Sequence, residues 1–148
     1  PDHDATSLRT LFAELDAVAP ARGEVVRHLL RDAGGRVLGW YVAFTPAGGI
    51  VQVLQLAATG PDPGPVLDHL VAHADSRAAA AVAGRLEPSL ADAVRARRCL
   101  VRPAAWALVD TDDTGVLAAL DADDTLLTRL DGEWWMGHHV LWREGNTA

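Results

Sequence analysis

The chain has 148 residues, 49% of them hydrophobic, and a formal net charge of −7, which disfavours electrostatically driven binding to nucleic acid or to anionic membranes. This length suits one domain with one core, so residues 1–148 are expected to form a single domain. The lone cysteine, Cys99, excludes an internal disulfide, and no apolar run reaches the ~18–20 residues that span a bilayer, which makes the cytoplasm the expected compartment.

An amphipathic helix is the first element that the sequence predicts. Apolar residues recur at three- and four-residue steps over 8–18, and Pro20 is expected to stop the helix. Its polar face is expected to be solvated surface. Three residues near its start have side chains suited to the N-cap: Asp4, Thr6 and Ser7.

Three strands joined by two glycine-containing turns are predicted next. Segments rich in β-formers over 24–32 and 36–44 flank Gly34-Gly35, a pair able to adopt the positive φ of a hairpin turn. A second turn over 46–49 leads into a β-branched and apolar strand over 50–59. The expected arrangement is an antiparallel meander.

A tight loop and a helix follow the third strand. Two glycines and three prolines break the apolar run over 60–65. Apolar residues at helical spacing then predict a helix to Ala74, with Pro65 as a suitable first residue because no N–H is needed there. Such a unit points backbone N–H groups and the positive helix end at whatever lies beyond the strand.

The remaining elements are shorter. Ser89 and Asp92 are spaced almost as in a capping box, so Ser89 is expected to start a helix. The expected order is a weak strand over 79–86, a helix over 89–98, a strand over 99–110, a helix from 112 to 120 with Val116, Leu117 and Leu120 inward, an extended segment over 125–130 and a turn at 131–132.

Together these elements predict a mixed sheet with helices on both faces. Over about 5–109, their order and the run Gln55-Leu56-Ala57-Ala58 before a glycine-containing loop and a helix resemble the GCN5-related N-acetyltransferase (GNAT) superfamily. The resemblance implies an α/β (α+β) fold with a GNAT-like mixed sheet, an antiparallel meander followed by alternating helices and strands. The family's usual first strand and helix would have to precede Leu8, so the chain is expected to be an excised or C-terminal lobe of a longer protein.

The resemblance also implies acetyl-CoA or another acyl-CoA as co-substrate. In this family the strand that corresponds to 51–58 parts from its neighbour, and its free backbone groups bind the pantetheine arm. The next loop wraps the pyrophosphate. The resemblance places five residues at this cofactor: Leu56, Ala57 and Ala58 along the arm, and Gly60 and Gly64 in the phosphate loop.

The loop departs from the family's glycine-rich pattern. Pro61, Pro63 and Pro65 each remove a backbone donor from the expected cluster of N–H groups. Asp62 and Asp68 bring negative charge toward a pyrophosphate, and no arginine lies between Arg36 and Arg77. These changes weaken the expected phosphate site.

The sequence leaves the catalytic residues unknown. An N-acyltransferase needs a base for the amine and usually an acid for the departing thiolate. The family often places a tyrosine on the helix that corresponds to 89–98, and this helix has none. Tyr41 and Glu24 are minor candidates, and both are better explained as ordinary strand residues.

No metal site is expected. His69 and His73 are four apart on one helix, but the sequence HExxH is absent and no third ligand is within sequence reach, so a solvated helix face is favoured. His138-His139 lie on a predicted strand, where neighbouring side chains point to opposite faces and joint ligation is awkward.

Two further groups have structural explanations. Cys99 follows Arg95, Arg97 and Arg98, which would lower the pKa of an exposed thiol, but a packing role at a strand start is favoured. The arginines are expected to be a solvated helix end. Trp134-Trp135 is expected to close the core, with a partner interface as the alternative.

Two functions remain open. The first is a GNAT-like acyl-CoA-dependent N-acyltransferase that acts on an unidentified amine, either a small molecule or part of a protein. The alternative is a non-catalytic GNAT-fold binding or assembly module that has lost the pyrophosphate loop. A homodimer or a partner lobe is expected in either case if a sheet edge needs cover.

Overall fold

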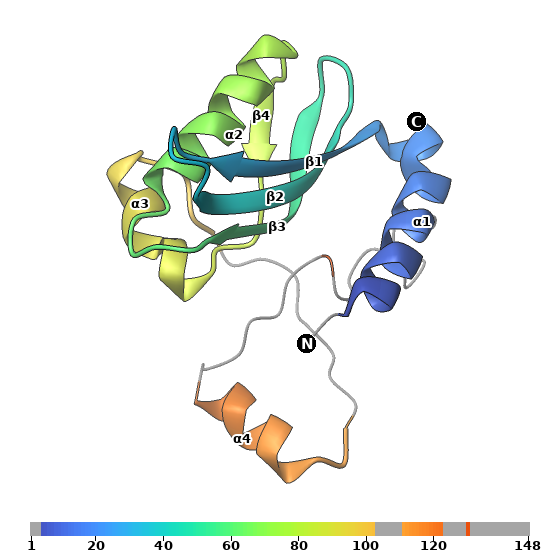
Figure 1. The fold of residues 1–148 in the computed structure, drawn as a ribbon, viewed down its shortest axis with the longest axis vertical. Helices are drawn as coiled ribbons and strands as arrows, with labels where there is room; N and C mark the ends of the chain where they lie inside the picture. Colours follow the sequence, from blue (N-terminus) through green and yellow to red (C-terminus); the bar gives the residue numbers. More distant parts are fainter. Residues whose placement is uncertain (1–3, 103–110, 123–129, 131–148) are drawn as a thin grey trace.

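The computed structural model describes residues 4–102, 111–122 and 130. The predicted order of a helix, a three-stranded meander, a helix, a strand and a helix is confirmed (Figure 1). The elements are α1 (Ala5–Arg22), β1 (Glu24–Arg31), β2 (Val37–Thr45), β3 (Ile50–Ala58), α2 (Gly64–Ser76), β4 (Ala81–Ala83), a 3-10 turn η1 (Pro88–Leu90), α3 (Ala91–Ala96) and α4 (Thr114–Asp121).

The strands form one mixed sheet in the order β1-β2-β3-β4. The first three are antiparallel neighbours, and β4 is parallel to β3. A parallel neighbour requires a crossover, which α2 supplies by packing across the face of the sheet. The predicted mixed sheet is therefore confirmed.

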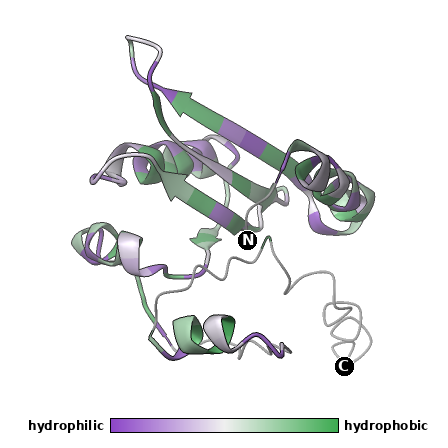
Figure 2. Ribbon diagram, turned by 60° about the horizontal axis from the view of Figure 1, so that its bottom comes forward, coloured by the Kyte–Doolittle hydropathy of each residue, from purple (hydrophilic) through white to green (hydrophobic). Residues whose placement is uncertain are grey.

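Two apolar layers enclose the sheet, because successive strand residues point to opposite faces. Tyr41 and Ala43 lie on the α2 side, and Val42 and Phe44 lie on the α1 side. Figure 2 shows mainly hydrophobic strands between helices that carry both hydrophobic and hydrophilic residues. The α1-side cluster consists of Leu11, Leu15, Val42, Phe44, Leu54 and Leu130.

The boundaries of α1 differ from the prediction at one end. Asp4 caps its start by accepting hydrogen bonds from the amides of Thr6 and Ser7, as expected. The expected stop at Pro20 is wrong, because the helix continues to Arg22. Gly23, with a φ of 102°, ends the helix and donates its N–H to the Ala19 carbonyl.

The elements after α2 are shorter than predicted. Only Ala81–Ala83 of the predicted 79–86 strand is a strand, and the predicted 89–98 helix is η1 followed by α3. The Ser89 cap is wrong, since Leu90 is the N-cap of α3 and makes no side-chain cap bond. The expected strand start and packing role of Cys99 are also wrong, because Cys99 is exposed and outside any strand.

The helix expected from residue 112 is confirmed as α4. The Asp113 carboxylate caps its start by accepting hydrogen bonds from the amides of Gly115 and Val116. Val116 and Leu117, expected inward, are 40% and 43% exposed. Predictions for 103–110, 125–129, Trp134-Trp135 and His138-His139 lie outside the described residues. None of the helices in the described part of the chain has the length and hydropathy needed to cross a bilayer.

Candidate functional site

The sheet parts along β3. Its pairing with β4 covers only Ile50, Val51 and Gln52, opposite 81–83, whereas its pairing with β2 continues to Ala58. From Val53 onward the outer edge of β3 therefore has no ladder partner in β4. β4 thus ends before the stretch of β3 to which the resemblance assigns the pantetheine arm.

A β-bulge lies where the strands part. Val42 pairs with Gln55 and Ala43 pairs with Val53, so Leu54 is an extra residue in β3. Leu54 belongs to the α1-side cluster, and Gln55 lies opposite Val42 of that cluster, so the bulge brings two consecutive side chains to one face. The Gln55 Oε1 atom is buried and has no hydrogen-bond partner among the described residues.

One residue of the later chain reaches this opening. The amide of Leu130 donates a hydrogen bond to the Leu54 carbonyl at 3.1 Å, and the Leu130 side chain is fully buried in the α1-side cluster. The outer edge of β3 therefore has one backbone contact at the bulge that does not come from β4.

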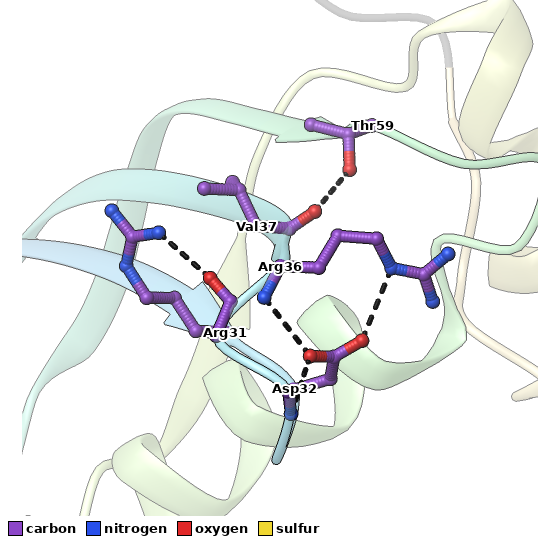
Figure 3. Close-up of polar contacts among 7 residues, drawn as sticks. Arg31, Asp32, Arg36, Val37 and Thr59 are labelled. Atoms are coloured by element: carbon purple, nitrogen blue, oxygen red, sulfur yellow. Dashed lines mark hydrogen bonds and ion pairs between the residues drawn. The ribbon is translucent and has the colours of Figure 1, made fainter.

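The backbone directions at the end of β3 follow from Thr59. Its amide donates to the Leu38 carbonyl at 2.9 Å, and its hydroxyl donates to the Val37 carbonyl at 2.6 Å (Figure 3). Because backbone groups alternate along a strand, those of Ala57 point to β2 and those of Leu56 and Ala58 point to the parted edge. The assignment of these three residues to the pantetheine arm stays a prediction, with Leu56 and Ala58 in the suitable orientation.

The first turn of α2 uses its own donors. The Asp62 carboxylate accepts the Gly64 amide at 2.8 Å, and the Pro63 carbonyl accepts the amides of Val66 and Leu67, each at 3.1 Å. A phosphate bound here would have to displace the Asp62 carboxylate from Gly64. The assignment of Gly60 and Gly64 to a phosphate loop stays a prediction.

Arg97 compensates one of the two carboxylates near the loop. Its Nε and Nη2 atoms lie 2.9 and 2.7 Å from Asp68 Oδ1, and Nη2 also donates to the Gly64 carbonyl at 3.2 Å. The expectation of a solvated Arg97 is wrong, since only 28% of its side chain is exposed. Sequence reasoning missed this pair because 29 positions separate the two residues and no local spacing connects them.

A second polar group lies between α2 and the first two strands. The ring centroid of His28, on β1, is 5.1 Å from that of His69 and 4.9 Å from that of His73, both on α2. The Tyr41 hydroxyl and His69 Nδ1 share a hydrogen bond of 3.0 Å. We expected both histidines on a solvated helix face. His69 is exposed, although its Nδ1 is hydrogen-bonded to Tyr41. The expectation is wrong for His73, whose Nε2 is buried.

Burial shifts the pKa values of two members of this group, Tyr41 and His28. It raises the pKa of Tyr41 to about 12, so the hydroxyl stays protonated at neutral pH. Burial also lowers the pKa of His28, and the nearby imidazoles of His73 and His69 lower it further. Among the described residues, no three histidine, cysteine or acidic side chains are arranged to hold a metal ion.

Sequence reasoning missed His28 as a member of this group. The alternation of β1 was a usable signal, because His28 shares a strand face with Val26 and Leu30, which both contact the α2-side core. An open hollow of about 360 Å³ borders the group. Its lining consists of His28, Leu29, Leu30, Arg31, Leu38, Pro65 and His69.

The minor catalytic candidates occupy different environments. Glu24 is exposed and forms an ion pair with Arg77, which follows α2. Tyr41 is fully buried beneath α2 and hydrogen-bonds to His69. The geometry therefore gives neither residue a free catalytic group at the parted edge of β3.

No protein-family model matches the chain, and no curated protein sequence matches it. Among solved structures, the fold is similar to a "Putative acetyl transferase from Pyrococcus furiosus", with a TM-score of 0.51 and 13% sequence identity. The similarity covers 74% of this chain and 82% of that one. At this identity the likeness concerns the fold alone, and it agrees with the predicted mixed α/β architecture.

Proposed function

We propose that this chain is a GNAT-like N-acyltransferase that moves an acyl group from acyl-CoA to an amine. The observation that carries the proposal is the parted sheet, in which β4 pairs with β3 only from Ile50 to Gln52. Among the described residues nothing pairs with Leu56 or Ala58 on the outer edge, so their backbone groups supply the donors and acceptors in this proposal. The pantetheine arm has two amide groups, whose hydrogen-bonding needs match such an edge.

The transfer requires a neutral amine and a proton for the departing thiolate. The amine nitrogen attacks the thioester carbonyl, a C–N bond forms, the C–S bond breaks, and the departing thiolate accepts the proton that the amine releases. An α-amine with a pKa near 8 is already partly neutral at pH 7.5, so it can react without a strong base.

The pyrophosphate end of the cofactor is expected to contribute weakly. The Asp62 carboxylate already accepts a hydrogen bond from the Gly64 amide, and its negative charge repels a phosphate. Asp68 repels it less, because Arg97 compensates its charge. Most of the cofactor affinity is therefore assigned to the pantetheine arm.

A second function has specific support. The amides of Gly64, Val66 and Leu67 have internal acceptors, and Leu130 contacts the parted edge at Leu54. Both features suit a non-catalytic binding or assembly module with the same fold. Its partner would be a protein, a second copy or another lobe of a longer chain. The cytoplasm stays the proposed compartment for both functions.

Asp62→Ala distinguishes the two functions. It frees the Gly64 amide and removes a negative charge, so acetyl-CoA affinity is expected to rise about tenfold, or 1.4 kcal/mol. Isothermal titration calorimetry at pH 7.5 measures the change. Asp75→Ala, the same substitution near the other end of α2, is the control and leaves the affinity unchanged. Thiol release from acetyl-CoA in the presence of polyamines, amino acids and peptides then tests transfer.

The enzyme proposal fails if neither the natural chain nor Asp62→Ala binds acetyl-CoA at millimolar concentration while both are folded. Binding without thiol release for any amine class would favour the non-catalytic module. The acceptor amine is identified by the class that releases thiol fastest.

A further inference from the structure

Three imidazoles meet at one junction between α2 and the sheet. The histidine cluster consists of His28, His69 and His73, with His28 in the middle at 5.1 and 4.9 Å from the other two ring centroids. We propose that this cluster is a proton-operated switch, in which protonation of the imidazoles loosens α2 from β1 and β2.

The surroundings of His28 disfavour a charged ring. The His28 and Tyr41 ring centroids are 5.0 Å apart, and the Tyr41 side chain is fully buried, so one wall of the cluster offers little water to a charged ring. The Tyr41 hydroxyl and His69 Nδ1 share a hydrogen bond. His73 Nε2 is buried without a partner among the described residues, so a proton added there would lack an acceptor.

The charged groups on the neighbouring elements do not compensate a protonated cluster. On β1, Glu24 forms an ion pair with Arg77, and Arg31 is a further cation beside the hollow. β2 contributes the neutral Tyr41. On α2, Asp68 is bound by Arg97.

Two carboxylates nearby complete the set of charges. Asp32, in the β1–β2 turn, is bound by Arg36 (Figure 3). Asp75 follows His73 by two positions on α2, a spacing that places the two side chains on different faces of a helix. A second positive charge in the cluster would therefore lie about 5 Å from the first, as the ring separations indicate, and no carboxylate among the described residues is matched to it.

The direction of the pH effect follows from proton linkage. Because the pKa of His28 is lowered in the folded chain, the unfolded chain binds more protons below its own histidine pKa of about 6.5. The free energy of unfolding is therefore highest above pH 6.5, where His28 is neutral in both states. It falls as the pH drops from 6.5 to the pKa of His28 in the folded chain.

The switch has a consequence for the parted edge if the chain binds acyl-CoA as proposed above. The first turn of α2 begins at Gly64, directly after the loop assigned to the phosphate, and His69 is five residues along the same helix. Loosening α2 in mild acid would displace this turn and weaken cofactor binding. That consequence rests on the proposed function, whereas the switch itself does not.

Urea unfolding of the full chain at pH 7.5, 6.5 and 5.5, without cofactor, tests the switch. The ratio of folded to unfolded chain is expected to fall toward pH 5.5, by up to about tenfold per pH unit for each excess proton bound by the unfolded chain. His28→Gln is expected to lose most of this dependence. Asp75→Asn removes a titratable group from the same helix and is expected to keep it, because carboxylates titrate near pH 4.

Equal stability of the natural chain at pH 7.5 and 5.5 would overturn the proposal, and so would an unchanged pH dependence in His28→Gln. If that variant does not fold, NMR titration of the imidazoles in the natural chain decides. A His28 pKa below 6.5 supports the switch, and a value at or above 6.5 overturns it. Acetyl-CoA titration at pH 7.5 tests the acyltransferase separately, so either idea can fail alone.

Discussion

The two edges of β3 differ in how fully their backbone groups are used. The inner edge pairs with β2 from Phe44 to Gly39, and Thr59 extends that contact with two further hydrogen bonds. Within the part of the chain that the structure describes, the outer edge pairs with β4 over its first three residues and then receives one amide, from Leu130. One strand thus provides both a fixed support for the fold and an edge available to a ligand.

This difference separates stability from function along one strand. Substitutions that disturb the sheet pairing at the inner edge, or the packing of α2 against it, are expected to destabilise the fold. Substitutions at the loop beside the outer edge are expected to change ligand affinity with less effect on folding. Three substitutions test this difference between the two edges, beginning with the one that should destabilise the fold most.

Gly39→Ala is expected to break the inner edge. A Cβ atom at Gly39 would lie 2.2 Å from the Ala57 carbonyl oxygen and 2.7 Å from a methyl group of Val66. Because the first neighbour is backbone, the free energy of unfolding should fall by about 3 kcal/mol or more. Urea denaturation measures the loss. Gly60→Ala is the control, since a Cβ at Gly60 meets nothing within 4 Å, and an equal loss in both variants would contradict the close packing.

Leu130→Ala tests the cover at the outer edge. The side chain is fully buried in the α1-side cluster, so its truncation should lower the free energy of unfolding by about 2–3 kcal/mol. Leu100→Ala, at a position that is 90% exposed, should change it by less than about 0.5 kcal/mol. Chemical denaturation of the two variants side by side gives the comparison, and similar values would show that Leu130 is not anchored in the cluster.

Thr59→Val removes the smallest of these contacts. The Thr59 hydroxyl donates to the Val37 carbonyl at 2.6 Å on an exposed part of the sheet, so its loss should cost about 0.5–1 kcal/mol. The isosteric change keeps the hydrogen bond from the Thr59 amide to the Leu38 carbonyl. Thermal unfolding measures the effect. A loss as large as that of Gly39→Ala would mean that the Thr59 hydroxyl hydrogen bond stabilises the end of β3 as much as the close packing at Gly39 does.

The local patterns of the sequence predicted most of the fold. Alternation predicted the meander, helical spacing predicted α1 and α2, and Asp113 marked the start of α4. The errors also have local causes. α1 continues through Pro20 and ends where Gly23 takes a positive φ.

The candidate sites were harder to predict, because they depend on contacts between distant residues. Arg97 and Asp68 meet only when α3 packs against α2, and His28 meets His69 and His73 only when α2 crosses the sheet. The composition of the loop at 60–65 correctly raised a problem for phosphate binding. It did not reveal that Asp62 caps Gly64.

Amide chemical shifts during an acetyl-CoA titration test whether acyl-CoA binds along the outer edge of β3. We expect saturable shifts at Leu56 and Ala58, whose N–H groups point to the parted edge, and smaller shifts at Ala57, whose N–H points to β2. Absence of shifts in β3 at millimolar acetyl-CoA, in a folded chain at pH 7.5, would contradict such binding.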